Sequence, residues 1–211
     1  MVQALPKILT LEEYLEYDFP PDSTWELENG VLRKLPAESE LNRQVAMMLV
    51  ILFSRLGIPF QRLSHKTDVV VSSGRATVRN PDLLVLLEPL PGESLKAKSS
   101  TVLQEMPPPD LAVEGVSPGR EAIARDYRQK RTEYAICQIS EYWIVDPNEK
   151  KVSTLTLVDG FYDVAEFPGE MAIASPFLQS LITEFPNTLK NSFSLKAVDV
   201  LTPQLPEFQD N

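Results

Sequence analysis

Apolar residues recur at helical spacing in several stretches of the chain, and these stretches predict helices. The longest runs from about Glu38 to Leu56, where Gly57 favours a helix stop. A short helix is expected over Thr10–Tyr17, because the sequence T-L-E-E at its start forms a capping box. A further helix is predicted over Arg120–Cys137.

Strand-like segments occupy much of the remaining chain. Two hairpins are indicated by the turns Asn29-Gly30 and Asp159-Gly160, which lie between flanks of alternating character. Other segments are short apolar runs, as expected for strands buried on both faces. The expected strands and hairpins are Trp25–Leu35, Thr67–Val71, Asp82–Leu87, Leu111–Val116, Glu141–Asp146, and the pair Lys151–Val158 and Phe161–Phe167.

The order of these elements indicates an α/β fold in which helices pack against a mixed β-sheet. We expect a single domain over residues 1–211, with a core at about residues 8–168. Proline-rich residues 88–110 are expected to form a surface excursion, and residues 201–211 a loose tail.

Composition narrows the class of protein. The chain is 43% hydrophobic and 24% charged, which is typical of a globular domain. Its longest apolar run, Ala46–Phe53, is too short to span a bilayer, and its first residues lack the pattern of a secretory signal. A cytoplasmic location is therefore expected. The net charge of −10 argues against a broad nucleic-acid surface, so any nucleic acid would have to meet a local basic patch.

Cysteine and histidine each occur once, as Cys137 and His65. An internal disulfide, a thiolate zinc cluster and a multi-histidine metal site are therefore excluded within one chain. A nucleophile–base pair of these two residues has no supporting local motif. Any metal must be held mainly by oxygen ligands, which favours magnesium, manganese or calcium.

Two carboxylates lie in otherwise apolar, strand-like segments, where an acidic side chain is unusual. Glu114 lies in the apolar sequence L-A-V-E-G-V, and Asp82 opens an equally apolar strand. Taken singly, Asp82 is explained as a turn residue after Pro81 and Glu114 as an edge residue facing solvent. Together they suggest a shared role, because an unpaired buried carboxylate is strongly disfavoured.

Lys130 adds the third charged group. It lies three residues after Tyr127 and four before Tyr134, on the helix stripe that should face the sheet. Its ammonium either snorkels to solvent or meets buried negative charge. Asp82 and Glu114, with the Gly115 carbonyl, would hold a hard divalent cation at adjacent strand ends. Lys130 would then stabilise developing negative charge.

The segment VEGVSPGREAIARDYRQKRTEYAICQISEYWIVDP resembles the Uma-two family of restriction endonucleases, also called domain of unknown function 820. The family pattern is Glu-Val-x-Ser-Pro, Asp-x-x-x-Lys-x-x-x-Tyr and Glu-Tyr-Trp-x-Val-Asp-Pro. Upstream, Pro81-Asp82 resembles its Pro-Asp element, and Trp25–Gly30 its early hairpin. The resemblance covers about residues 8 to 168.

The resemblance implies the restriction-endonuclease-like fold of the Pro-Asp…Asp/Glu-x-Lys superfamily. It implies that Asp82 and Glu114 are metal ligands, with Mg²⁺ or Mn²⁺ as cofactor. The usual lysine two residues after the acid is replaced by Val116, and the lysine role carries over to Lys130. Two positions depart from the pattern: Gly115 replaces an apolar residue, and Asn42 stands near where many members have histidine.

A basic patch is the candidate contact for nucleic acid. Residues 120–131 hold five basic and two acidic side chains, a local net charge of +3. Such a run is either a solvated helix face or a phosphate contact. The candidate phosphate-binding residues are Arg79, Arg120, Arg125 and Arg128.

Two functions stay open at this point. The first is a magnesium-dependent endonuclease that hydrolyses phosphodiester bonds, with DNA as the expected substrate. The second is a non-catalytic module on the same scaffold that binds nucleic acid or protein, favoured by the acidity and by the departures at Gly115 and Asn42. A hairpin edge such as Lys151–Phe167 is a candidate contact for a homodimer.

Overall fold

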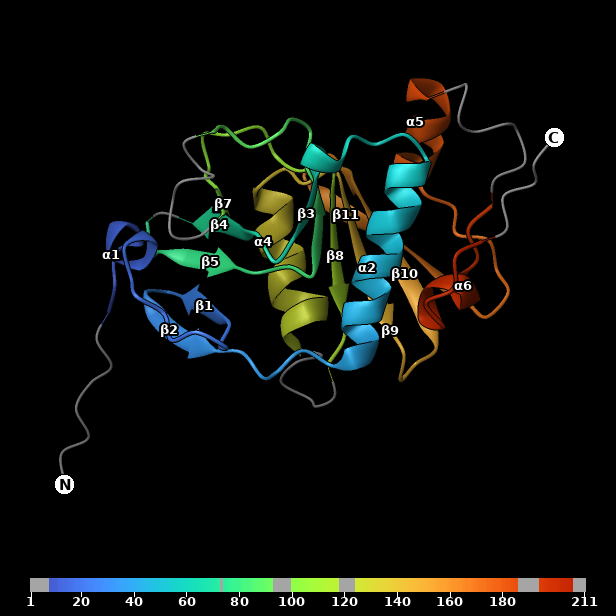
Figure 1. Cartoon of the computed structure of the whole chain (residues 1–211). Coiled ribbons are helices and arrows are strands. Elements are labelled where there is room, and N and C mark those ends of the chain that lie inside the picture. The colour runs from blue at the N-terminus through green and yellow to red at the C-terminus, as the bar shows by residue number, and fades with distance from the viewer. Residues whose placement is uncertain (1–7, 73, 93–99, 118–123, 186–193, 207–211) are drawn as a thin grey trace.

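The structure is a computed structural model, and it describes residues 8–72, 74–92, 100–117, 124–185 and 194–206. Within these residues the strands form two sheets, one of five strands and one of six (Figure 1). The prediction of a mixed α/β fold is confirmed, while the single sheet is corrected to two.

The five-stranded sheet contains the N-terminal hairpin and has the order β2-β1-β5-β4-β7. Its pairs are antiparallel except β4 with β7. Helix α1 begins after Thr10, which forms the predicted capping box with Glu13. The bounds are α1 Leu11–Leu15, β1 Trp25–Glu28, β2 Val31–Lys34, β4 Asp68–Ser72, β5 Thr77–Arg79 and β7 Thr101–Val102.

The six-stranded sheet has the order β11-β10-β9-β8-β6-β3. Only β8 and β9 run parallel, and the other neighbours are antiparallel. The bounds are β3 Leu63–His65, β6 Leu83–Val85, β8 Leu111–Gly115, β9 Glu141–Asp146, β10 Lys151–Val158 and β11 Phe161–Pro168.

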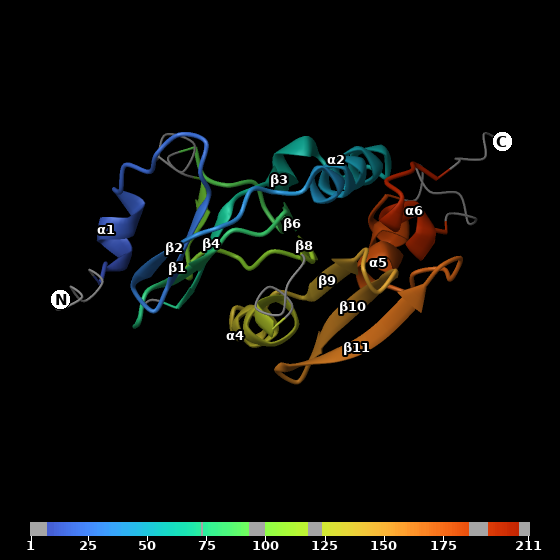
Figure 2. The same ribbon diagram turned by 90° about the horizontal axis from the view of Figure 1, so that it is seen from below.

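Helices cover both faces of the six-stranded sheet (Figure 2). On one face, helices α2, α5 and α6 enclose an apolar core that includes Leu49, Phe53 and Trp143. On the other face lies helix α4, preceded by one π-helical segment. The bounds are α2 Glu40–Arg55, the short 3-10 helix Phe60–Arg62, the π-helix Arg125–Gln129, α4 Lys130–Ile136, α5 Pro176–Glu184 and α6 Ala197–Leu201.

The expected elements are present in the described residues, with one change. The predicted helix Arg120–Cys137 starts in residues 118–123, which lie outside the described part, and it is π-helical over Arg125–Gln129 before α4 begins. The structure also adds elements. Strands β3, β5 and β7 and helices α5 and α6 were not predicted. Residues 88–110 are not irregular throughout, because β7 lies within them and is buried against β4. Helix α6 includes Leu201, the first residue of the expected tail, and residues 207–211 lie outside the described part. No helix among the described residues is long and apolar enough to cross a membrane.

Candidate functional site

Strand pairing brings Asp82 and Glu114 together. Strands β6 and β8 are antiparallel with Leu83 opposite Val113, so the next step of the register places Asp82 beside Glu114. Both side chains are buried, with 8% and 4% of their residue surface exposed. Asp82 Oδ2 also accepts a hydrogen bond of 2.7 Å from the Gly115 backbone N–H. The two acids expected to cooperate therefore lie on the same face of neighbouring strands.

Lys130 lies buried against Glu114, so of the two directions that the helix stripe left open for its ammonium, the structure shows the inward one. Its Nζ donates to Glu114 Oε1 at 2.7 Å and lies 3.3 Å from Glu26 Oε1 and 3.7 Å from Asp126 Oδ1. The Tyr134 hydroxyl donates to the same Glu114 oxygen at 2.7 Å. Only 2% of Lys130 is exposed. The ammonium thus points into the protein at the acidic pair.

Burial and charge change the acid–base properties of this group. Burial raises the pKa of Glu114 to about 7, although Lys130 lowers it. Burial disfavours the charged form of Lys130, but Glu114, Glu26 and Asp126 outweigh it and raise the Lys130 pKa. Lys130 is therefore a permanent cation near neutral pH, while Glu114 takes up a proton as the pH falls through about 7.

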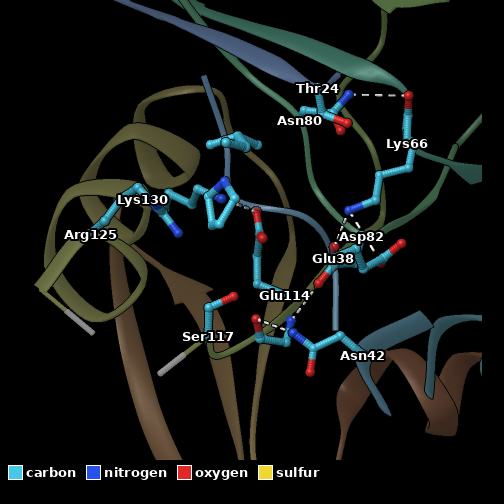
Figure 3. A pocket seen from close by; sticks show the side chains of 13 residues that line it. Thr24, Glu38, Asn42, Lys66, Asn80, Asp82, Glu114, Ser117, Arg125 and Lys130 are labelled. Carbon is cyan, nitrogen blue, oxygen red and sulfur yellow. Dashed lines mark hydrogen bonds and ion pairs between the residues drawn. The ribbon is translucent and has the colours of Figure 1, made fainter. Parts of the chain in front are cut away.

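A second lysine approaches the acids from the opposite side. The Lys66 ammonium makes an ion pair with Asp82 Oδ1 and lies 3.3 Å from Glu38 Oε1. Figure 3 shows Lys130 on one side of Glu114 and Lys66 with Asp82 on the other. Each predicted acid thus has its own lysine. Lys66 was not among the predicted site residues, and its position directly before the predicted strand Thr67–Val71 gave no sign of a buried ion pair.

Gly115 and Asn42 form a close contact at the end of β8. Asn42 Nδ2 donates to the Gly115 carbonyl at 3.0 Å. A Cβ at position 115 would lie 2.5 Å from Asn42 Cγ, which is closer than side chains tolerate. The two departures from the family pattern therefore match each other: the glycine leaves the space that the asparagine fills.

Arg79 is a correction to the predicted phosphate contacts. It is completely buried, and its guanidinium is held by Glu26 at 3.0 Å and by Glu133 at 2.7 and 2.8 Å. These carboxylates satisfy its charge inside the protein, so it has no surface to offer a phosphate. Its role is structural, because it joins β1 and β5 to helix α4.

Two of the other predicted arginines are found on the π-helix. Arg125 lines the pocket and is half-buried beside Asp126, 3.2 Å away, whereas Arg128 is exposed. Arg120 lies outside the described residues. Arg125 and Arg128 are therefore the predicted phosphate contacts that the described surface retains.

The two acids and both lysines line one pocket with a volume of about 50 Å³. This volume admits a cation and a few water molecules. Among the described residues, the lining consists of Thr24, Leu35, Pro36, Glu38, Asn42, Lys66, Asn80, Asp82, Glu114, Gly115, Ser117, Arg125 and Lys130.

The oxygen atoms that line the pocket suit a divalent metal. Two lining oxygens, Glu38 Oε1 and Asn80 Oδ1, are buried without a hydrogen-bond donor. With the carboxylates of Asp82 and Glu114, the pocket offers the oxygen ligands that Mg²⁺ and Mn²⁺ prefer. The described residues contain no cluster of three or more His, Cys, Asp or Glu side chains arranged as a metal site. The residues fit a cation that keeps several water ligands.

The fold and this pocket define a class of α/β protein with an acidic centre beside a buried lysine. The family model "Putative restriction endonuclease", named Uma2, matches residues 11–186, so the chain belongs to this family. The comparison with curated proteins gives no match.

A solved structure supports the same fold. It is the crystal structure of "a putative nuclease belonging to DUF820" from Anabaena variabilis, with a TM-score of 0.66 and 14% sequence identity. The match covers 92% of this chain and 98% of that one. The predicted restriction-endonuclease-like fold is therefore confirmed, and the family supports a nuclease function.

Proposed function

We propose that this protein is a metal-dependent endonuclease that hydrolyses phosphodiester bonds, with DNA as substrate. The observation that carries the proposal is the pairing of Asp82 with Glu114 on neighbouring strands, with the Lys130 ammonium 2.7 Å from Glu114. Asp82, Glu114 and the Gly115 carbonyl would hold Mg²⁺ or Mn²⁺.

A bound Mg²⁺ would stabilise negative charge on the phosphoryl group and increase the acidity of the attacking water. Lys130 keeps its proton near neutral pH and provides a fixed positive charge where the reaction develops negative charge. Two further residues orient the pair of Glu114 and Lys130. Tyr134 donates a hydrogen bond to Glu114, and Glu26 lies beside Lys130. Arg125 and the exposed Arg128 would contact the phosphate backbone.

The test measures cleavage of supercoiled DNA with Mg²⁺ or Mn²⁺, and of RNA in parallel. The variants Asp82→Asn, Glu114→Gln and Lys130→Met are each expected to lose activity by roughly 10²–10³-fold, because each removes charge that acts in the transition state. Glu166→Gln is the matched control, since this exposed glutamate pairs with Lys151 on the β10–β11 hairpin. A wild-type protein that cleaves neither nucleic acid with either ion contradicts the proposal.

A non-catalytic nucleic-acid-binding module is the second candidate. It is favoured by the engagement of both Asp82 oxygens inside the protein, one by Lys66 and one by the Gly115 N–H. This alternative predicts DNA binding that is unchanged by EDTA and no cleavage under any metal condition. A gel-shift assay with and without EDTA separates it from the endonuclease.

A further inference from the structure

The Lys66 side chain occupies a position where a divalent cation is expected. Its ammonium is ion-paired with Asp82 Oδ1 and lies 3.3 Å from Glu38 Oε1, and all three residues line the pocket. The other Asp82 oxygen accepts the Gly115 N–H at 2.7 Å. A cation that approached Asp82 Oδ1 from the pocket would therefore meet a positive charge already in contact with it.

The backbone of Lys66 holds this arrangement in place. Lys66 lies between β3 and β4 with a φ of +56°, in the left-handed region that costs a lysine about 1 kcal/mol. The Asn80 side chain stabilises this turn, because its Nδ2 donates to the Lys66 carbonyl at 3.1 Å and to Asp68 Oδ1 at 2.8 Å. The direction of the side chain is thus set by the fold of the turn.

Glu38 offers a second partner for the same ammonium. Its Oε1 is buried without a hydrogen-bond donor and lies 3.3 Å from Lys66 Nζ. About a quarter of the Lys66 side chain is exposed, so its end has room to move. A small rotation of the side chain toward Glu38 would release Asp82 Oδ1 and give Glu38 a full ion pair.

We propose that Lys66 is an internal counter-ion of the active site, and that a divalent metal binds to Asp82 by displacing the Lys66 ammonium toward Glu38. The inference rests on the proposed function, because it takes Asp82 as a metal ligand. It adds two positioning residues, Lys66 and Glu38, which set the metal affinity through charge. The Lys66 ammonium stays paired with a carboxylate in both states, with Asp82 before metal binding and with Glu38 after it.

The first experiment measures Mn²⁺ binding by isothermal titration calorimetry. Lys66→Met is expected to bind Mn²⁺ at least about tenfold more tightly than wild type, because the competing cation is gone. Lys66→Arg keeps the charge and is expected to stay near the wild-type affinity. Lys196→Met is the matched control for net charge, since Lys196 is exposed, pairs with Glu170 and does not line the pocket. An unchanged or weaker affinity in Lys66→Met overturns the proposal.

The second experiment tests the role of Glu38 with a double-mutant cycle. Glu38→Gln is expected to weaken Mn²⁺ binding several-fold in the wild-type background, because the displaced lysine loses its second partner. In the Lys66→Met background the same change is expected to have a clearly smaller effect, because no displaced lysine then needs a second partner. Equal weakening in both backgrounds would make Glu38 a direct metal ligand and overturn the displacement mechanism.

Cleavage assays on the same variants separate this inference from the proposed function. Tighter Mn²⁺ binding by Lys66→Met, with no cleavage by any variant or by wild type, supports the counter-ion and overturns the endonuclease. Unchanged Mn²⁺ affinity, with metal-dependent cleavage by wild type, overturns the counter-ion alone. No Mn²⁺ binding by wild type or by folded Lys66→Met, as judged by circular dichroism, overturns both.

Discussion

The two faces of the six-stranded sheet differ in what they bury. On the face covered by α2, strand β8 presents Leu111 and Val113 to a core of apolar side chains. On the face covered by α4, the same strand presents Ala112 and then Glu114. There the apolar packing gives way to buried charges that are paired with one another.

This difference separates two kinds of stabilisation. The α2 face is stabilised by removing apolar surface from water, which needs no particular partner. Each charge on the α4 face depends on an opposite charge, and these come from other elements: Lys130 reaches β1 through Glu26 and β8 through Glu114. The charged face is therefore more sensitive to single changes and to pH.

The largest expected effect is that of Lys130→Met. This change removes the cation that lies between the carboxylates of Glu114, Glu26 and Asp126, so these buried negative charges lose a shared partner. The free energy of unfolding should fall by about 3–5 kcal/mol at pH 8. Burial already raises the Glu114 pKa to about 7, and loss of the lysine raises it further. The destabilisation should therefore shrink toward pH 6, as Glu114 becomes protonated. Urea unfolding at both pH values measures it.

Leu49→Ala is the matched control on the other face. Leu49 is completely buried in the α2 core, so the change should cost about 3 kcal/mol through lost packing. This loss should be the same at pH 6 and pH 8, because no titrating group is affected. An equal pH dependence in both variants, or a Lys130→Met cost below about 1 kcal/mol, would remove the distinction between the faces.

A smaller effect is expected for Asp68→Asn, at the edge of the charged region. Burial raises the Asp68 pKa to about 6, although Asn80 and Tyr14 donate hydrogen bonds to it. Because the folded pKa lies above the unfolded one, wild type loses stability as the pH rises from 4 through 6. The variant should avoid this loss and gain on the order of 2 kcal/mol over wild type between pH 4 and pH 7. Urea unfolding across this range measures the gain, and a pH-independent difference would contradict it.

The smallest effect is expected at Gly115, at the end of β8 beside Asn42 of α2. A Cβ there would clash with Asn42, so Gly115→Ala should cost about 1 kcal/mol and displace the Asn42 side chain. The double variant Gly115→Ala/Asn42→Ala should cost less than the sum of the single changes, because the two residues share one space. Thermal unfolding of the four proteins gives the coupling, and simple additivity would contradict it.

Much of the fold was predictable because its signals are local. Capping at Thr10, the Asn29-Gly30 turn and the apolar period of α2 all act within a few residues of one another. The same kind of spacing placed Lys130 on the helix stripe that faces the sheet, although it left open whether the ammonium snorkels to solvent or meets Glu114. Helices α5 and α6 were not predicted, although Phe177, Leu178 and Leu181 of α5 are buried in the core.

The remaining site residues depend on contacts between distant segments. Lys66 acts through the turn that directs it at Asp82, and Glu38 approaches it from the segment just before α2. Arg79 was expected at the surface, because nothing near it in the sequence indicates a buried partner. Its partners are distant along the chain: Glu26 lies 53 residues before it and Glu133 lies 54 residues after it. Charge alone does not tell whether an arginine faces solvent or a buried acid. That depends on which acidic residues the fold brings next to the arginine.

The Arg79 guanidinium has a consequence for any attempt to divide this protein. It links Glu26 of the five-stranded sheet to Glu133 of the helix that covers the six-stranded sheet. A fragment with only the first sheet would keep Arg79 and Glu26 but lose Glu133. A fragment with only the second sheet would keep Glu133 without its arginine partner. The Arg79 network therefore joins the two sheets through buried charge, because neither sheet alone supplies both carboxylates that hold the guanidinium.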